Sequence, residues 1–324
     1  MKAIVQDRYG GPEVLRLAER GEPTPGAGEV VVEVVATGVD AGTVHLLEGR
    51  PAPVRLAMPL KGERVLGMEV AGRVRAVGDD VTDLSAGDAV FGSARLGHGG
   101  LAEYAVVRRD RLARRPPGVT FGEAAALVVS GSAALKATQA ARIAEGDRVL
   151  VLGAAGGVGH LAVQVAKAAG AMVVGACSRT KTDLVASVGA DEVIDYTAED
   201  PLRRGPFDAI IDTGGHRPLR ALRRALTPRG ALVLVGAEPE GAPMAGLGRA
   251  IVAAMLDPFA RQRLVMLAST ESVAALDTLA AHAAAGKLRP VIDAEYPLEA
   301  AAEAIARIGH GKGRGKVVVR VRPE

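Results

Sequence analysis

The chain has 324 residues, of which 48% are hydrophobic and 24% are charged. This composition can bury a full core, which excludes a disordered chain, and the length is typical of about two domains. A net charge of only +3, with four tyrosines, four phenylalanines and no tryptophan, argues against a nucleic-acid-binding protein, which needs a clustered basic surface or aromatic stacking platforms.

The first third of the chain is predicted to be β-rich. Valine-rich or alternating runs bounded by Gly and Pro predict strands at Glu29–Val35, Glu69–Val77, Ala89–Phe91 and Ala102–Val107. The proline pair in Arg114–Thr120 ends this pattern, because proline stops the preceding element. We therefore expect a domain boundary close to residue 120.

From Phe121 onward the pattern alternates between helices and strands. Such alternation predicts βαβ units and a parallel sheet covered on both faces, an α/β fold. The expected helices are Phe121–Ala141, Val158–Ala169, Thr182–Val188 and Thr270–Ala285. The expected strands are Asp147–Leu152, Met172–Cys177, Glu192–Tyr196, Ala209–Asp212 and Ala231–Gly236.

Two later segments need separate interpretation. Pro239–Leu267 is rich in Gly, Ala and Met and lacks clear periodicity, so we expect an irregular, mobile lid beside the substrate. Lys316–Val321 alternates as a strand does, and we expect it to return to the first domain.

A glycine-rich turn follows the strand that ends at Leu152 and precedes a helix. Gly153 would permit the tight turn, Gly156 would let backbone amides approach a diphosphate, and Gly159 would let the helix pack on the sheet. The diphosphate would lie at the positive end of the helix. The other residues of this predicted nucleotide site are Ala154, Ala155, Gly157 and Val158. The alternative is a loop that starts a helix and binds nothing.

The next strand ends in Cys177-Ser178-Arg179-Thr180-Lys181. An NAD site favours an acidic residue here, which would accept the ribose hydroxyls. Two cations and two hydroxyls favour a 2′-phosphate instead, and Arg179 could bind it through two hydrogen bonds. We therefore predict NADPH as the cofactor, with a solvated basic loop as the alternative.

Potential metal ligands are few and scattered. The single cysteine, Cys177, excludes a disulfide scaffold or a cysteine-based structural zinc site, and no two of the six histidines have ligand spacing. We therefore predict no metal. No apolar run is long enough to cross a membrane, and the N-terminus leads directly into a strand pattern instead of a signal peptide. We expect a cytoplasmic protein.

Several motifs resemble the medium-chain dehydrogenase/reductase superfamily, in its zinc-independent quinone oxidoreductase-like branch. The resemblance extends over essentially the whole chain. Met68 replaces the zinc-binding histidine of the superfamily's Gly-His-Glu segment, and Gly38–Ala41 lies where zinc-dependent members carry a cysteine ligand. The other matching segments are Tyr9–Leu15, Gly67–Val74, Gly99–Tyr104, Leu152–Gly159, Gly189–Tyr196 and Gly315–Val318.

The resemblance implies a GroES-like β-rich catalytic domain, residues 1–120 and 286–324, and a Rossmann domain, residues 121–285, with a cleft at their junction. It implies a homodimer. By position, Ser178, Lys181 and Tyr196 would surround the 2′-phosphate, and Arg179 is added from its chemistry. The remaining predicted cofactor-binding residues are Ser132, Thr213, Gly214, Val235, Gly236, Ala237 and Lys316.

Without a metal, nothing strong would polarise a simple ketone, so hydride transfer would favour acceptors activated by conjugation. The resemblance thus implies an oxidoreductase acting on quinones or α,β-unsaturated carbonyls. The candidate proton donors or carbonyl anchors are Asp40, Thr43 and His45, although their loop could simply pack against the cofactor. Two further alternatives are a nucleotide-binding protein with little turnover and a zinc alcohol dehydrogenase, which the missing ligands disfavour.

Overall fold

The computed structural model describes residues 1–50, 55–56, 59–60, 62–235, 247–257, 260–267, 271–309 and 313–324. The chain divides into two compact units. The first unit contains Met1–Ser132, Thr270–Gly286 and Pro290–Glu324, and the second contains Ala133–Ser269 and Lys287–Arg289.

This division differs from the sequence-based one at Lys287–Arg289, which fall in the second unit, and in two larger segments. The boundary lies inside the helix α3 (Phe121–Ala141), after Ser132. The sequence did not reveal this position, because helical periodicity does not show at which residue a helix passes from one unit to the other. The helix α8 (Val273–Ala284) belongs to the first unit, since it packs on the strand β7 (Tyr104–Arg114).

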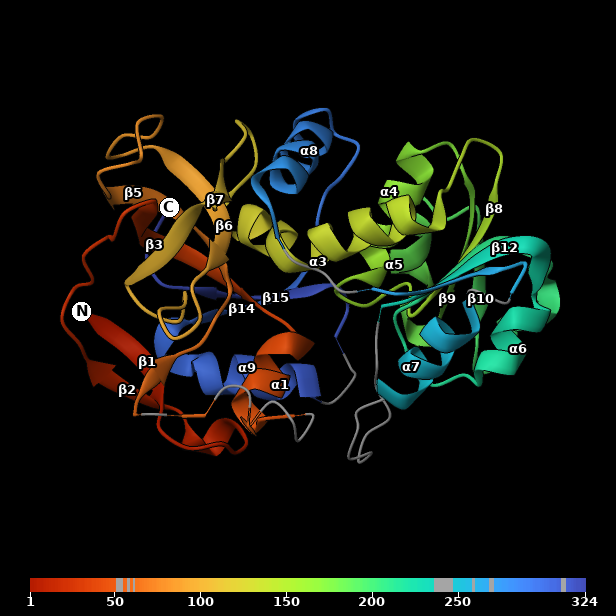
Figure 1. The fold of residues 1–324 in the computed structure, drawn as a ribbon, viewed down its shortest axis with the longest axis horizontal. Coiled ribbons are helices and arrows are strands. Elements are labelled where there is room, and N and C mark those ends of the chain that lie inside the picture. Colours follow the sequence, from red (N-terminus) through yellow and green to blue (C-terminus); the bar gives the residue numbers. More distant parts are fainter. Residues whose placement is uncertain are drawn as a thin grey trace. The chain divides into compact units, whose positions relative to one another are not determined.

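The first unit is a β-rich barrel with two further strands on one side (Figure 1). One sheet has the order β14-β15-β3-β5-β6-β7, and pairing between β3 and β7 closes its last four strands into a ring. A smaller sheet has the order β2-β1-β4. The remaining strands of this unit are β1 (Lys2–Gln6), β2 (Arg16–Glu19), β3 (Glu29–Val39), β4 (Arg64–Val65), β5 (Glu69–Val77), β6 (Ala89–Ala94), β14 (Ile292–Pro297) and β15 (Lys316–Arg320). Its other helices are α1 (Ala41–Glu48), α9 (Ala301–Gly309) and the short 3-10 turns η1 (Pro12–Val14) and η5 (Leu298–Ala300).

Alternating valines build the barrel core. Val30, Val32 and Val34 of β3 are fully buried in one cluster with Val90 of β6 and Val107 of β7, as period-two patterning requires of a strand with one face inward. β15 pairs antiparallel with β3, with Val318 opposite Gly38. The prediction that the last strand returns to the first domain is therefore confirmed.

The second unit is a six-stranded sheet with the order β10-β9-β8-β11-β12-β13, and every described pairing in it is parallel. Its strands are β8 (Arg148–Leu152), β9 (Met172–Cys177), β10 (Glu192–Asp195), β11 (Phe207–Asp212), β12 (Leu226–Leu234) and β13 (Arg263–Met266). Its helices are α4 (Gly159–Ala168), α5 (Thr182–Ser187), α6 (Leu219–Arg224), α7 (Leu247–Leu256) and the turns η2 (Arg179–Lys181) and η3 (Pro201–Arg204).

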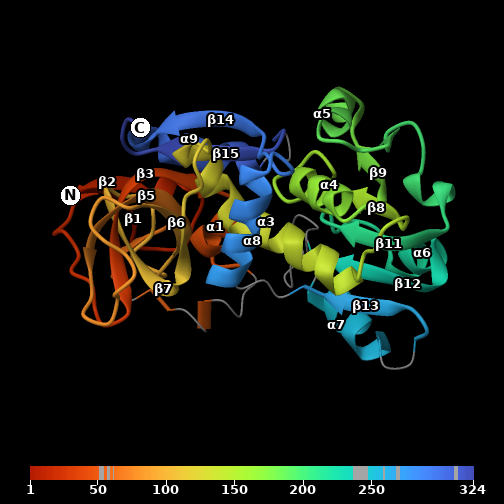
Figure 2. The same cartoon turned by 90° about the horizontal axis from the view of Figure 1, so that it is seen from above.

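Helices cover both faces of this parallel sheet (Figure 2). Leu222 of α6 and Ala253 of α7 join the apolar cluster that contains Ile210 and Leu232. On the opposite face, a Cβ at Gly175 of β9 would lie 2.4 Å from Val185 of α5, so this glycine permits close helix-to-sheet packing. The predicted α/β class, a GroES-like domain with a doubly wound Rossmann domain, is confirmed.

One sequence interpretation was wrong. Within Pro239–Leu267, expected to be irregular, the structure has the helix α7 and the edge strand β13. β13 has only four residues, and it is a strand because it pairs with β12. No local sequence pattern reveals this pairing. Residues 239–246, also assigned to the expected lid, lie outside the described residues. In the described part of the chain, no helix has the length and apolarity needed to cross a membrane.

Candidate functional site

The glycine-rich turn has the geometry of a nucleotide-binding turn. Gly153 has φ +75°, a conformation that strongly favours glycine, and a Cβ on it would lie 2.5 Å from Thr213 Oγ1. A Cβ on Gly159 would lie 2.1 Å from the carbonyl oxygen of Gly153. These two glycines therefore allow α4 to begin directly against the end of β8, as the sequence predicts.

The middle of the turn is open on one side. A Cβ on Gly156 would meet only the carbonyl oxygen of Gly153, at 3.3 Å, whereas Ala154 and Ala155 are buried beneath it. His160, fully buried at the start of α4, has its Nδ1 atom 2.8 Å from the carbonyl oxygen of Gly156. Sequence reasoning gave His160 no role, and its position directly after Gly159 was the only available signal. The turn fits a diphosphate group in front of the α4 amides.

The ends of neighbouring strands lie beside this turn. The hydroxyl of Thr213 donates to the Leu152 carbonyl oxygen at 2.7 Å. The buried Asp212 accepts from the backbone N–H groups of Gly214 and Gly215 at 3.2 and 3.0 Å, and its own carbonyl oxygen accepts from Val235 N at 2.9 Å.

The carboxyl ends of β8, β11 and β12 thus meet at one edge of the sheet, where such folds bind their ligands. Val235 lies at this edge, and the predicted site residues Gly236 and Ala237 lie outside the described residues.

The basic corner after β9 also lies beside the end of β10. Cys177 pairs with Asp195, and Tyr196 N donates to the Cys177 carbonyl oxygen at 3.0 Å, which places the half-exposed Tyr196 at this corner. The η2 turn carries Arg179, whose side chain is 78% exposed, and begins after Ser178, whose carbonyl oxygen accepts from Lys181 N at 2.9 Å.

Asp195 is a residue of this corner that sequence reasoning missed. Its Oδ2 atom accepts a hydrogen bond from Arg179 Nε at 3.0 Å. Hydrogen bonds from Thr197 and the charge of Arg179 hold the pKa of the Asp195 carboxyl below its ordinary value. The only signal in the sequence was that Asp195 ends the strand β10, whereas an acidic residue that binds ribose is expected at the end of β9.

Within the first unit, Asp40 and Thr43 come together at the start of α1. Asp40 Oδ1 accepts from Thr43 N at 2.8 Å and from Thr43 Oγ1 at 2.9 Å, an N-cap that also holds the hydroxyl proton. His45 lies two residues further along α1, and residues two apart do not share a helix face. The structure therefore joins Asp40 and Thr43, whereas His45 projects from another side of α1.

Lys316 takes part in a buried ion pair that sequence reasoning missed. Its Nζ atom lies 2.5 Å from Glu69 Oε2 and 3.1 Å from Ser130 Oγ. Ser132, another predicted cofactor-binding residue, is fully buried and donates its hydroxyl to the Val128 carbonyl oxygen at 2.6 Å. The cofactor roles of Lys316 and Ser132 stay predictions.

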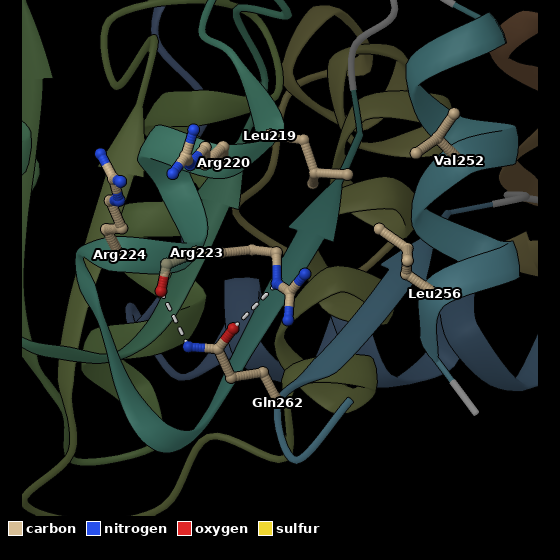
Figure 3. A pocket seen from close by; sticks show the side chains of 7 residues that line it. All are labelled: Leu219, Arg220, Arg223, Arg224, Val252, Leu256 and Gln262. Carbon is tan, nitrogen blue, oxygen red and sulfur yellow. Dashed lines mark hydrogen bonds between the residues drawn. The ribbon is translucent and has the colours of Figure 1, made fainter. Parts of the chain in front are cut away.

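A shallow groove of about 470 Å³ lies between α6 and α7 (Figure 3). Arg223 Nε donates to Gln262 Oε1 at 3.1 Å, and Gln262 Nε2 donates to the Arg223 carbonyl oxygen at 2.8 Å (Figure 3). No residue of the glycine-rich turn lines this groove. Among the described residues, no three His, Cys, Asp or Glu side chains gather as a metal site would require.

Comparison with protein families gives two matches in this chain. A family described as "Alcohol dehydrogenase GroES-like domain" matches residues 26–117, and one described as "Zinc-binding dehydrogenase" matches residues 188–319. A chloroplast envelope quinone oxidoreductase homolog from Arabidopsis thaliana is 32% identical, with 98% of both chains covered.

Solved structures agree with these matches. The quinone oxidoreductase from Coxiella burnetii superposes with a TM-score of 0.87 at 30% identity and covers 99% of both chains. A mycobacterial protein complexed with NADPH superposes with a TM-score of 0.80 at 26% identity, covering 99% of this chain and 100% of its own. With the barrel, the Rossmann sheet and the glycine-rich turn, these similarities show that the chain belongs to the quinone oxidoreductase-like proteins of the medium-chain dehydrogenase/reductase superfamily, and is an oxidoreductase.

Proposed function

We propose that this protein is an NADPH-dependent, zinc-independent oxidoreductase that transfers hydride to a quinone or an α,β-unsaturated carbonyl compound. The observation that carries the proposal is the turn Gly153–Gly159, which has room at Gly156 and leads into the first turn of α4. Similarity to proteins named quinone oxidoreductases supports the substrate class.

The basic corner supports NADPH over NADH. Arg179 and Lys181 supply two positive charges where a 2′-phosphate would lie, and the Arg179 side chain is 78% exposed. Asp195 anchors Arg179 through Nε, and a guanidinium group held in this way binds phosphate with little loss of side-chain freedom. A structural neighbour complexed with NADPH adds to this support.

NADPH, when bound, supplies the hydride, and the protein positions the reacting groups and moves the proton. The proton most directly available in the first unit is on Thr43 Oγ1, which donates to Asp40 Oδ1 at 2.9 Å. Thr43 has a single hydroxyl proton, so in a relay it would give this proton to the reduced carbonyl oxygen and regain one that Asp40 takes up from water. Zinc independence is supported by the resemblance noted above, in which Met68 replaces the zinc-binding histidine and the segment Gly38–Ala41, which has no cysteine, lies where zinc-dependent members carry one.

The proposal predicts rapid, metal-independent turnover. Protein dialysed against a chelator should oxidise NADPH with a small quinone or enone at about 1 s⁻¹ or faster, a common range for such enzymes. The measurement is the loss of nicotinamide absorbance, with zinc added back in a parallel sample. Unchanged activity after zinc addition is expected, whereas a requirement for zinc would overturn the metal-free chemistry.

The matched control is Gly159→Val, whose side chain would collide with the carbonyl oxygen of Gly153 and should abolish nucleotide binding. Tight NADPH binding by the unchanged protein, without turnover on any acceptor of a broad panel, would favour a nucleotide-binding protein with no enzymatic role.

We also propose a cytoplasmic homodimer, formed where two copies join at β13. This strand ends the described sheet order, and the helix α7 beside it exposes Ile251, Val252 and Met255 at 43%, 48% and 69%. An edge strand next to an apolar helix face favours pairing with a second copy. The buried free thiol of Cys177 agrees with a reducing compartment.

Met255→Glu should weaken the dimer at least about tenfold, because a charge would be buried at its centre. Light scattering at several protein concentrations measures the change. Met172→Glu is the matched control, since Met172 is 51% exposed at the start of β9, an inner strand of the sheet. Equal masses for both variants and the unchanged protein would place the interface elsewhere.

A further inference from the structure

The first unit contains a fully buried charged cluster that joins three distant elements. Lys316 of β15 donates from Nζ to Glu69 Oε2 at 2.5 Å and to Ser130 Oγ at 3.1 Å. Glu69 Oε1 also accepts from the backbone N–H groups of Val129 and Ser130 at 3.1 and 3.4 Å. Both charged side chains are 1% exposed. The burial of two charged side chains costs desolvation free energy, which their mutual attraction often does not fully offset. We therefore looked for a functional role of this pair.

The Glu69 carboxylate lies directly on the backbone that leads to Asp40. Gly38 and Glu69 are opposite each other in the pairing of β3 with β5. A Cβ on Gly38 would lie only 2.0 Å from Glu69 Oε2. Two residues later, Asp40 caps α1 and holds Thr43. A change in the charge or position of the Glu69 carboxylate therefore acts at the start of the loop that carries the candidate proton relay.

The electrostatics connect the same groups. Burial raises the pKa of Glu69 to about 7, the positive charge of Lys316 opposes that rise, and the negative charge of Asp40 adds to it. Lys316 from β15 and Asp40 from the loop after β3 are thus the charged groups that act on Glu69. Hydroxyl groups also lie near Glu69. They include those of Ser130, of Ser93, which is opposite Glu69 in the pairing of β5 with β6, and of Thr37, which donates to the Glu69 carbonyl oxygen at 2.5 Å.

We propose that Glu69 is a positioning residue, held by Lys316 and Ser130 against Gly38, whose proton occupancy controls the placement of the Asp40–Thr43 pair. The inference rests on the proposed function, since it assigns the proton relay of that reaction a buried partner. Glu69 touches neither substrate nor cofactor in this scheme, and it acts through Asp40. Of these two carboxyl groups, ionised Glu69 adds a second negative charge beside the backbone that leads to Asp40, whereas neutral Glu69 does not.

The pH dependence of turnover in three variants tests the proposal. The unchanged protein should show an inflection in kcat near the Glu69 pKa of about 7. Lys316→Met removes the opposing positive charge and should move that inflection upward by about one pH unit or more. Asp40→Asn keeps an N-cap residue but removes the carboxylate through which Glu69 acts, so it should lower kcat and remove the inflection, although the loss of the like charge lowers the Glu69 pKa itself. Glu69→Gln should also abolish the inflection, while KM changes little.

A second measurement remains valid if the protein has no activity with any acceptor. The carbonyl stretch of a protonated buried carboxylic acid, followed by infrared difference spectroscopy against pH, reports Glu69 directly. The band should titrate near neutral pH, shift upward in Lys316→Met and downward in Asp40→Asn, and be absent in Glu69→Gln. A band that titrates but no matching inflection in kcat would refute the coupling, and a band unaffected by Asp40→Asn would refute the link to Asp40. Absence of turnover with these band shifts intact would instead refute the proposed function.

Discussion

Replacement of Lys316 by methionine is expected to lower the free energy of unfolding by about 3–5 kcal/mol at alkaline pH, where Glu69 is ionised and left buried without its ion-pair partner. Both side chains of the pair are 1% exposed, and their closest charged atoms lie 2.5 Å apart. The two backbone N–H bonds to Glu69 remain in the variant, but they cannot replace a full positive charge. Urea denaturation, followed by the transition midpoint, measures the loss.

The loss should grow with pH. In the unchanged protein the Glu69 pKa is raised from 4.5 to about 7, so between these values the native state holds a proton that the unfolded chain releases. The Glu69 contribution to stability is therefore complete below about 4.5 and is lost as the pH rises toward 7. Removing Lys316 raises the folded pKa further, which extends the loss to higher pH. The variant should be closest to the unchanged protein in acid.

Two further variants distinguish the effect of breaking the buried ion pair from the effect of removing any positive charge. Arg108→Met breaks an ion pair with Asp110 whose side chains are 60% and 58% exposed, and it should change stability far less than Lys316→Met, because solvent screens such a pair. A double variant, Glu69→Met with Lys316→Met, should recover much of the stability, because apolar residues of similar volume often replace a buried pair without loss. Similar losses in Lys316→Met and Arg108→Met would contradict the burial described here.

The double variant Arg179→Ala with Lys181→Ala is expected to lower kcat/KM for NADPH by about 100-fold, since two charge-assisted bonds to a phosphate are lost. Its kcat/KM for NADH should fall little or even rise. Without Arg179, the Asp195 carboxylate loses the side chain that binds it at 3.0 Å, and it would repel a 2′-phosphate yet could accept a ribose hydroxyl. Steady-state kinetics with both cofactors give the ratio.

Arg229→Ala is the matched control, because it removes an exposed arginine of β12 outside the basic corner. It should leave the NADPH-to-NADH ratio unchanged. Addition of Asp195→Asn to the double variant Arg179→Ala with Lys181→Ala should then lower its kcat/KM for NADH relative to that for NADPH. An unchanged ratio in the double variant would show that the 2′-phosphate, if bound at all, lies away from Arg179 and Lys181.

Local sequence signals located most of the Rossmann unit. The strand predicted at Met172–Cys177 has those bounds, and the turn predicted from Gly153 to Gly159 separates β8 from α4. These elements are periodic or depend on glycine, so neighbouring residues specify them. The four-residue β13 has no such signal, because its alignment with β12 decides its structure.

Side-chain partners depended on tertiary structure throughout the candidate site. The N-cap pair of Asp40 and Thr43 is three residues apart, which is within reach of local reasoning. The pair formed by Glu69 and Lys316 is 247 residues apart in sequence. Nothing near Lys316 in the sequence indicates that its side chain would form an ion pair in the interior.

The sequence by itself determined the two kinds of architecture, the nucleotide-binding turn and the basic residues that follow β9, because each follows from spacing within a short segment. Only the tertiary structure decided that α7 and β13 complete the Rossmann sheet, that Asp195 holds Arg179, and that Glu69 lies against Gly38 with Lys316 as its partner. The physical reason is that burial and charge pairing depend on which distant segments meet, and the free energy of those contacts is absent from any local pattern.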